Sequence, residues 1–480
     1  MNAKKLTCLF LLTALLLTSC GGTSTGTDTT ADMAEGTGTT TTTEEKEYEF
    51  AEFDGYEFRI LNADDIYSMH ARIEAEETNG ETLNDIQYER CRTLEEKMGI
   101  TIAETNMGVD NDVANHASQV VMAGEDAYDI MYIPARDLKK FTGEGYLYNL
   151  LDFDEFNFDE AWWLQNYNEP STLNGKLYAA ASYSQLMIID SVWCVYYNES
   201  IGETLKLDTP YSLAKEGKWT LDVMQTYLKT AGNLNGDDSF TWNADGKAFY
   251  GIALGGPSYL ITGADELYVE NIDGELTYTA GSDRFYNVVS KVTQVLNKND
   301  GSVMYKTSNV SDDTSGHYIY TFEHERSLMM VAELAKTNRM RDKNYSFGIL
   351  PTPKYDENQE NYISVPFYGT PCLTIPVTVD NPERAAAISD ALAYLSYEMV
   401  WPVFRKVTLE QKNLRNKESI EMLDVIIKSV VPQLSTIYGI STGASDVAAV
   451  SARGDDSVAS VIASYKEAAQ TQIDKINKGE

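Results

Sequence analysis

Residues 56–61, Tyr-Glu-Phe-Arg-Ile-Leu, alternate polar and hydrophobic side chains with the period of a β-strand. A helix is predicted next, because Thr82 and Asp85 form a capping box and Gly99 stops an apolar periodicity. Residues 128–133 have the pattern of another strand. Strand, helix and strand in alternation predict an α/β domain with a largely parallel sheet.

The same two patterns recur to the end of the chain. Helix 219–231 is predicted from its Thr220 cap, and a second helix begins at Asn381-Pro382. After about Glu418 the pattern is mostly helical. Further strands are predicted at residues 176–180, 192–197, 250–254, 328–331, 347–350 and 373–377.

The first twenty residues have the features of an export signal. A basic start precedes an apolar run over residues 6–17, which is too short to span a bilayer. Residues 17–20, Leu-Thr-Ser-Cys, resemble the lipobox of bacterial lipoproteins. This resemblance implies removal of residues 1–19 and lipidation of Cys20, with the protein held at the outer face of the cytoplasmic membrane by its lipid anchor only. Residues 20–47, rich in Thr and Gly, are then expected to form a disordered tether.

Composition narrows the possible partners. The formal net charge of −35 repels phosphate backbones, so nucleic acid is not expected as a partner. Five cysteines include Cys8 in the signal and Cys20 at the lipobox. The other three, Cys91, Cys194 and Cys372, are an odd number without paired spacing. They predict buried thiols rather than a disulfide framework or a zinc site.

Catalytic motifs are incomplete in this sequence. Residues 439–443, Gly-Ile-Ser-Thr-Gly, match a nucleophile elbow around Ser441, but that arrangement needs a later histidine and the last one is His324. No metal-binding spacing and no cofactor fingerprint is found, so no catalytic residue, metal or cofactor is predicted. A glycoside hydrolase stays open, because it needs only two suitably placed carboxylates among 73 acidic residues.

Aromatic and polar residues in predicted loops are the candidates for ligand contact. The chain has 31 Tyr and 6 Trp, and such rings can cover an apolar face of a ligand while charged groups hydrogen-bond to its polar rim. Parallel sheets bind ligands at the carboxyl ends of their strands. Residues after predicted strands or in loops are therefore expected in a ligand site, namely Asn62, Asp64, Asp65, Arg136, Trp163, Trp242, Tyr259 and Glu333.

Several segments, in order, resemble the extracytoplasmic solute-binding proteins of ABC importers, in particular the carbohydrate-binding cluster (family 1) that includes maltose-binding protein. They are Gly-Tyr-Leu-Tyr-Asn-Leu from residue 145, Gly-Lys-Leu-Tyr-Ala-Ala from 175, Lys-Trp-Thr-Leu-Asp from 218 and Gly-Ile-Leu-Pro-Thr-Pro-Lys from 348. The resemblance covers roughly residues 50 to 475. The first strand and its loop differ from those of maltose-binding protein, so maltose itself is not implied.

The resemblance implies a two-lobed periplasmic-binding-protein-like fold (type II), with a hinge and a ligand cleft between the lobes. Lobe 1 would comprise residues 48–182 plus about 370–430, lobe 2 residues 183–369, and residues 431–480 would be helices packed on both. Chain crossings are expected near 180–184 and 366–371, which adds Tyr183, Phe367 and Tyr368 to the candidate ligand residues.

The function implied is capture of a sugar, oligosaccharide or other small polar solute by a monomer, without catalysis. Closure around the solute would present it to the permease subunits of an ABC transporter. A cell-surface glycan-adhesion lipoprotein without transport is the alternative that the resemblance leaves open, beside the glycoside hydrolase.

Overall fold

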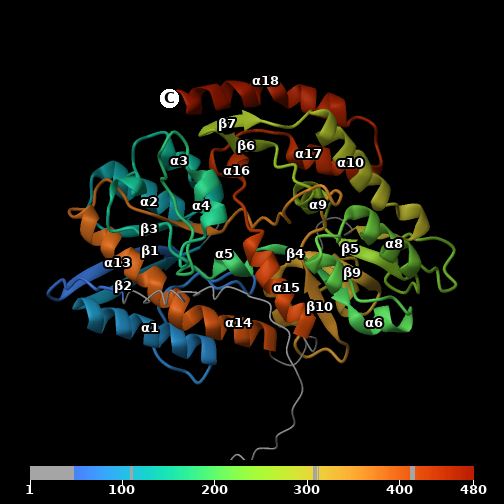
Figure 1. Cartoon of the computed structure of the whole chain (residues 1–480), viewed down its shortest axis with the longest axis horizontal. Coiled ribbons are helices and arrows are strands. Elements are labelled where there is room, and N and C mark those ends of the chain that lie inside the picture. Colours follow the sequence, from blue (N-terminus) through green and yellow to red (C-terminus); the bar gives the residue numbers. More distant parts are fainter. Residues whose placement is uncertain (1–47, 109–111, 306–310, 312, 411–416, 480) are drawn as a thin grey trace, which may run out of the picture. The chain divides into compact units, whose positions relative to one another are not determined.

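The computed structural model describes residues 48–108, 112–305, 311, 313–410 and 417–479. Residues 50–480 form one compact unit, and the fold below is that of this unit (Figure 1). The predicted signal peptide, the lipidation site Cys20 and the predicted tether lie outside the described residues.

A four-stranded sheet contains the first strand predicted from sequence, in the order β11-β3-β1-β2. Strand β1 pairs in parallel with both β2 and β3, whereas β11 joins the edge antiparallel to β3. The expected largely parallel sheet is therefore confirmed. Its strands are β1 (Tyr56–Ala63), β2 (Ile100–Met107), β3 (Ile130–Pro134) and β11 (Pro371–Thr374).

Helices α1 (Thr82–Met98) and α2 (Asp112–Ala123) lie on opposite sides of these strands in Figure 1. The predicted stop of α1 is confirmed, because Gly99 follows it at φ 64°, a left-handed conformation that glycine adopts without strain. The predicted capping box is wrong. The helix is preceded by Glu81 without a side-chain cap, and Asp85 instead accepts from the amides of Asn79 and Gly80 at 2.9 and 3.3 Å.

A second, five-stranded sheet has the order β10-β4-β9-β5-β8. Strand β4 is antiparallel to both of its neighbours, and β9, β5 and β8 run parallel to one another. These strands confirm the predictions at 192–197, 250–254, 328–331 and 347–350 to within a few residues. They are β4 (Trp193–Asn198), β5 (Tyr250–Leu254), β8 (Val303–Tyr305), β9 (Ser327–Glu333) and β10 (Phe347–Leu350).

The second sheet is surrounded by helices, of which α8 was predicted from its cap. The Thr220 hydroxyl accepts from the amide of Val223 at 3.4 Å, and α8 packs against β5 and β9. The helices of this region are α5 (Met187–Asp190), α6 (Glu199–Thr204), α7 (Tyr211–Lys215), α8 (Leu221–Ala231), α9 (Ser258–Gly263), α10 (Asp283–Val295), η3 (Lys298–Asp300), α11 (Tyr318–Glu323), η4 (Leu334–Lys336) and α12 (Thr337–Met340).

The carboxyl-terminal region is helical, as predicted, and contacts both parts of the unit. Helix α15 packs on β10 and α7, and α17 packs on α10. Helix α18 packs on the hairpin of β6 and β7 at the upper margin of Figure 1. These elements are β6 (Val269–Ile272), β7 (Glu275–Tyr278), α13 (Pro382–Leu395), η5 (Ser396–Val400), α14 (Trp401–Glu410), α15 (Lys417–Lys428), α16 (Leu434–Ile437), α17 (Ala444–Arg453) and α18 (Val458–Asn477).

Two predicted strands need correction. Residues 176–180 form no strand and make only isolated bridges, from Lys176 to Leu173 and from Ala180 to Leu373. Strand β11 begins at Pro371 rather than residue 373 and ends at Thr374, because Pro376 has no amide proton to continue a ladder. The short helices of this region are η1 (Ala135–Asp137), α3 (Lys139–Thr142), η2 (Leu150–Asp152) and α4 (Gln165–Ser171).

The chain passes between the two sheets in two segments that lie side by side. Residues 181–192 lead into β4, and residues 364–370 lead into β11. The amide of Trp193 donates to the Val365 carbonyl at 3.1 Å, and that of Phe367 donates to the Ser191 carbonyl at 3.0 Å. The Ser191 and Thr370 hydroxyls are 2.7 Å apart. We call these two stretches the crossing segments. The predicted lobe boundaries stay a prediction, since residues 50–480 form one compact unit.

The prediction of three buried thiols is confirmed. Cys91, Cys194 and Cys372 are all buried free thiols.

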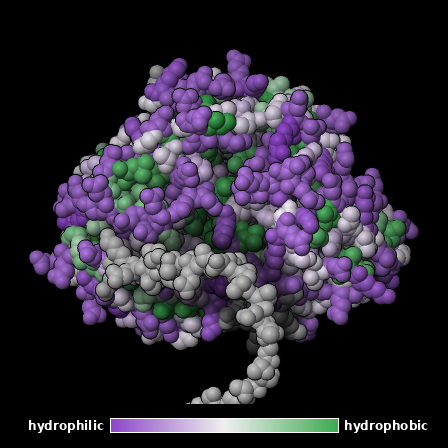
Figure 2. Space-filling model, viewed as in Figure 1, coloured by the Kyte–Doolittle hydropathy of each residue, from purple (hydrophilic) through white to green (hydrophobic). Residues whose placement is uncertain are grey.

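Across the described residues, no helix is both long and apolar enough to cross a membrane. Figure 2 shows mostly hydrophilic residues over this face of the molecule, with hydrophobic ones in smaller patches, in keeping with the high net charge.

Candidate functional site

Five aromatic side chains gather where the crossing segments meet the two sheets, and we call them the crossing cluster: Tyr67, Trp193, Tyr259, Phe367 and Tyr368. The rings of Trp193 and Tyr259 stack with centroids 3.6 Å apart and planes 12° from parallel. Phe367 lies 4.3 Å from Tyr368 and 6.5 Å from Tyr67, ring centre to ring centre. Burial, the charge of Glu333 and the nearby Tyr368 side chain raise the pKa of Tyr259. The backbone hydrogen bonds from Trp193 to Val365 and from Phe367 to Ser191 join the two halves of the cluster.

Tyr67 is presented on a strained turn. Ile66 and Met69 bond to each other through their backbones, so Tyr67 and Ser68 form a two-residue hairpin loop with φ of 55° and 66°. Such loops prefer Gly or Asn, because other side chains are strained at positive φ. The Tyr67 side chain is nevertheless 58% exposed. Strain of this kind is characteristic of functional positions, where a side chain must be held in one place. We call residues 66–69 the Tyr67 turn.

Charged groups surround these rings. The guanidinium of Arg136 lies 5.2 Å from the Tyr368 ring centre, and the Arg136 amide donates to the Tyr368 carbonyl at 3.0 Å. The Lys336 ammonium lies 5.7 Å from the centre of the Tyr67 ring and donates to the Tyr67 carbonyl at 3.4 Å. Glu333 pairs with Trp193 across β9 and β4 and is 9% exposed. The cluster therefore combines ring faces with cationic donors and one carboxylate.

Trp193 has an unused hydrogen-bond donor. Its side chain is only 7% exposed, and within the described part of the chain no acceptor bonds to its buried Nε1. Buried donors in folded proteins are nearly always paired with protein or water. An indole N–H left over beside a stacked tyrosine is a group that a ligand oxygen or a bound water can satisfy.

The Tyr67 turn is attached to the first crossing segment through His70 and Asp190. His70 Nδ1 lies 2.5 Å from Asp190 Oδ2, and the His70 amide donates to the same oxygen at 3.0 Å. Asp190 is 1% exposed and belongs to α5. Burial opposes the charged imidazolium, but the charge of Asp190 and the hydrogen bond to it prevail, so the pKa of His70 is raised above 6.5.

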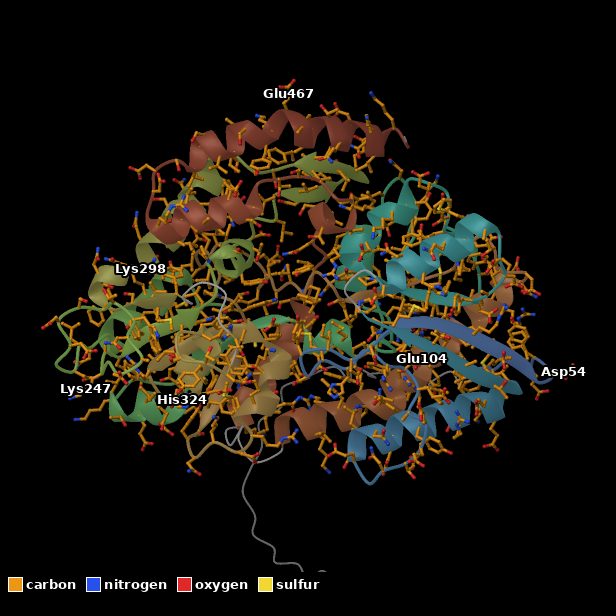
Figure 3. The ribbon with its side chains drawn as sticks, turned by 180° about the vertical axis from the view of Figure 1, so that it is seen from behind. Asp54, Glu104, Lys247, Lys298, His324 and Glu467 are labelled. Atoms are coloured by element: carbon orange, nitrogen blue, oxygen red, sulfur yellow. The ribbon has the colours of Figure 1, made fainter. Side chains whose placement is uncertain are left out.

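Three of the predicted ligand residues, Asn62, Asp64 and Asp65, stabilise the loop that follows β1. Asn62 is fully buried in β1, where its amide donates to the Ala71 carbonyl and to Glu104, both at 2.7 Å. Asp65 Oδ1 accepts from the amides of Ala71 and Arg72 at 2.7 and 3.0 Å. Asp64 pairs with Arg72 at 2.7 Å. Figure 3 labels Glu104 on the first sheet, the anchor point of this network.

Trp163 and Tyr183 are placed in packing. Trp163 is 2% exposed, its ring lies 4.7 Å from that of Phe158, and its Nε1 donates to Asp390 at 2.8 Å. Tyr183 is 9% exposed and packs its ring 5.2 Å from that of Trp401. Neither side chain belongs to the crossing cluster.

Trp242 lies apart from the other candidates. Its ring packs 6.1 Å from the ring of Tyr250, and the Arg326 guanidinium covers it at 4.3 Å. Figure 3 labels Lys247 of the same loop near the outer margin, on the side of the view opposite Asp54. The contacts that the structure shows for Trp242 include none with the crossing cluster.

The structure thus joins Arg136, Tyr259, Glu333, Phe367 and Tyr368 in one place. Sequence reasoning missed Tyr67, Trp193 and Lys336. No glycine or asparagine marks the turn at Tyr67, and Trp193 lies in a strand whose residues are all buried. The sequence pattern therefore identified the members of the cluster that lie in loops after strands, but not those in a strand or in an unmarked turn.

Comparisons with known proteins show the fold. No protein-family model matches the sequence, and no curated protein matches it either. A solved cyclo/maltodextrin-binding protein complexed with maltotetraose superposes with a TM-score of 0.57 at 13% identity, over 88% of this chain and 98% of the other.

Two further structures have the same TM-score of 0.57. A family 1 extracellular solute-binding protein from Bifidobacterium longum subsp. infantis is 14% identical, and the match covers 87% of this chain and 100% of the other. The cyclic alpha-maltosyl-1,6-maltose binding protein from Arthrobacter globiformis is 11% identical over 87% of this chain and 99% of its own. This chain therefore has the two-lobed α/β fold of these solute-binding proteins.

Proposed function

We propose that this protein is a solute-binding protein of the carbohydrate type, which captures a sugar or oligosaccharide and does not cleave it. The crossing cluster is the observation that carries the proposal. It lies where the chain passes between the two sheets, the position that a hinge-closing binding protein uses for its solute. The structural neighbours named above are binding proteins for sugars or for solutes, which supports this ligand class.

The chemistry of the cluster suits a sugar. Ring faces such as that of Tyr368, which is 47% exposed, can cover the apolar C–H face of a pyranose. Arg136 and Lys336 supply donors for hydroxyl oxygens, Glu333 supplies an acceptor, and the Trp193 Nε1–H is a further donor. The hydroxyls around the rim of a sugar ring can both accept from such donors and donate to such a carboxylate.

Attachment and delivery complete the proposal. Cys20 carries a lipid that holds the protein on the outer face of the cytoplasmic membrane, and ABC permease subunits receive the solute there. The lipobox-like residues 17–20 and the preceding apolar run support this part. Cys20→Ser should abolish incorporation of a fatty-acid probe, and equal labelling of the variant would overturn the anchor.

A thermal-shift screen of the purified protein tests the ligand class. The panel contains linear and cyclic oligosaccharides, with amino acids and short peptides as competing classes. A solute at about 100 times its dissociation constant should add about 2.7 kcal/mol to the stability of the folded state. Stabilisation by peptides and by no sugar would overturn the carbohydrate assignment.

The same screen separates binding from hydrolysis. Each stabilising oligosaccharide is incubated overnight with the protein and then analysed by chromatography. We expect the sugar to be recovered intact. Cleavage product in molar excess over protein would establish a glycoside hydrolase instead.

A further inference from the structure

We propose that His70 and Asp190 are positioning residues that hold the Tyr67 turn against α5, so that solute binding depends on the proton carried by His70. The inference rests on the proposed function, because Tyr67 matters only as part of a solute site. Neither residue lies in the crossing cluster; they act on the ligand through Tyr67.

Hydrogen bonds connect the Tyr67 turn to the first crossing segment. Two hydrogen bonds join His70 to one oxygen of Asp190, whose helix α5 precedes the residues that bond to the second crossing segment. The turn itself consists of four residues with two in left-handed conformation, and Tyr67 at its tip is mostly exposed. A strained turn of this kind stays in place only when its surroundings hold it. His70, one residue beyond the turn, is one such attachment, and the Lys336 ammonium, which donates to the Tyr67 carbonyl, is another.

The groups that influence the protonation of His70 come from several elements packed against it. Asp190 faces it from α5, Asp65 from its own loop, and Glu81 from the residue before α1. Helix α14 contributes the uncharged ring of Phe404, 6.4 Å from the imidazole centre. All of the charged groups among these are carboxylates, so each favours the protonated imidazole. The His70 side chain is 32% exposed, which leaves it open to exchange of its proton with solvent.

The direction of the effect follows from linkage. The pKa of His70 is raised above 6.5 in the fold, so the attachment contributes in full below that pH. It is lost as the pH rises through the higher pKa of the folded state. Above it, the buried Asp190 carboxylate no longer faces a cation, and the turn is held less firmly. Solute affinity is therefore expected to decline from mildly acidic to alkaline pH.

Hydrogen exchange on the full-length protein without solute tests the attachment directly. Amide exchange of residues 64–73 is compared at about pH 5.5 and about pH 8.5. Each rate is divided by the intrinsic exchange rate at that pH, so that protection factors are compared. We expect protection of this segment to fall about fivefold at the higher pH, the ratio that one partly buried ion pair supports. His70→Gln should lack the protection at both pH values, while β1 and β2 remain protected.

Two controls sharpen the test. His116→Gln should behave like wild type, because His116 pairs with Tyr128 at 2.9 Å and is not among the groups that act on the Tyr67 turn. Asp190→Asn should lower the pKa of His70, measured by NMR of labelled histidine, because it removes the facing carboxylate. Equal protection at both pH values in wild type, or a pH effect that survives in His70→Gln, would overturn the proposal. Because no solute is used, these outcomes are independent of the ligand screen.

Discussion

Asp390 is a buried carboxylate that organises the aromatic residues around Trp163. One of its oxygens accepts from the Nε1 of Trp162 at 3.1 Å and from that of Trp163 at 2.8 Å. Asn157 donates to the same carboxylate through its backbone amide at 3.1 Å and its side chain at 2.9 Å. This network explains why the side chain of Trp163, one of the predicted ligand residues, is buried.

Replacing Asp390 should therefore destabilise the fold without a specific effect on the solute. Asp390→Ala removes the acceptor of a 2% exposed indole and should lower the free energy of unfolding by about 2–4 kcal/mol. Asp390→Asn retains one oxygen acceptor and should cost less. Urea unfolding followed by tryptophan fluorescence gives both values. Equal stability of all three proteins would show that the network contributes nothing.

Trp193 is the corresponding single residue in the candidate site. Trp193→Phe keeps a ring beneath Tyr259 but removes the unpaired Nε1–H. If that donor bonds to the solute, affinity should fall about fivefold to tenfold, the loss of one hydrogen bond of about 1 kcal/mol or more. Calorimetry with the best sugar from the screen measures this change. Unchanged affinity would mean that the donor bonds to water in the complex.

At the scale of elements, local signals were sufficient for most helices and strands. The Thr220 cap, the Asn381 cap and Gly99 each act within one turn of helix, so their effects are visible in sequence. Residues 176–180 have a strand composition but obtain only isolated bridges, because pairing depends on partners far along the chain. The Tyr67 turn was missed for a similar reason, since tertiary contacts rather than turn residues hold it.

Replacing Tyr67 should affect solute affinity more than it affects the stability of the fold. Tyr67→Asn puts a residue that tolerates positive φ at the strained position, a relief of about 1 kcal/mol. The lost contact with Phe367 costs about 0.5–1 kcal/mol, so stability should change little. Solute affinity should nevertheless fall about fivefold or more, because a ring of the site is removed. Thermal melts and calorimetry on the same samples test both parts, and unchanged affinity would remove Tyr67 from the site.

On the scale of the whole molecule, the resemblance carried information that composition did not. Residues 364–370 can form a floor for a ligand only because residues 181–192 run beside them, although bonded residues such as Ser191 and Phe367 are 176 positions apart in sequence. No local pattern encodes that neighbourhood, yet Phe367 and Tyr368 were placed in the site through the expected crossing. Trp242 was predicted as a ligand residue from its polar loop alone. In the structure its ring packs on Tyr250, and the contacts shown for Trp242 include no residue of the crossing cluster.

If the solute lies between two lobes, binding should change the size of the protein. Small-angle X-ray scattering is expected to show a smaller radius of gyration with a saturating sugar than without it, because hinge closure draws the lobes together. A sugar that does not stabilise the protein in the thermal-shift screen serves as the control. An unchanged radius with a bound sugar would contradict closure while leaving the binding site in place.

The central claim is that the solute is held at the crossing cluster, and calorimetry on a matched pair of variants tests it most directly. Tyr368→Ala removes a ring from the cluster, whereas Trp242→Ala removes a larger ring that packs on Tyr250 at the start of β5. With the best sugar from the screen, Tyr368→Ala should weaken binding about fivefold to a hundredfold, a loss of about 1–3 kcal/mol. Trp242→Ala should bind like wild type. Loss of affinity in Trp242→Ala together with wild-type affinity in Tyr368→Ala would contradict the account.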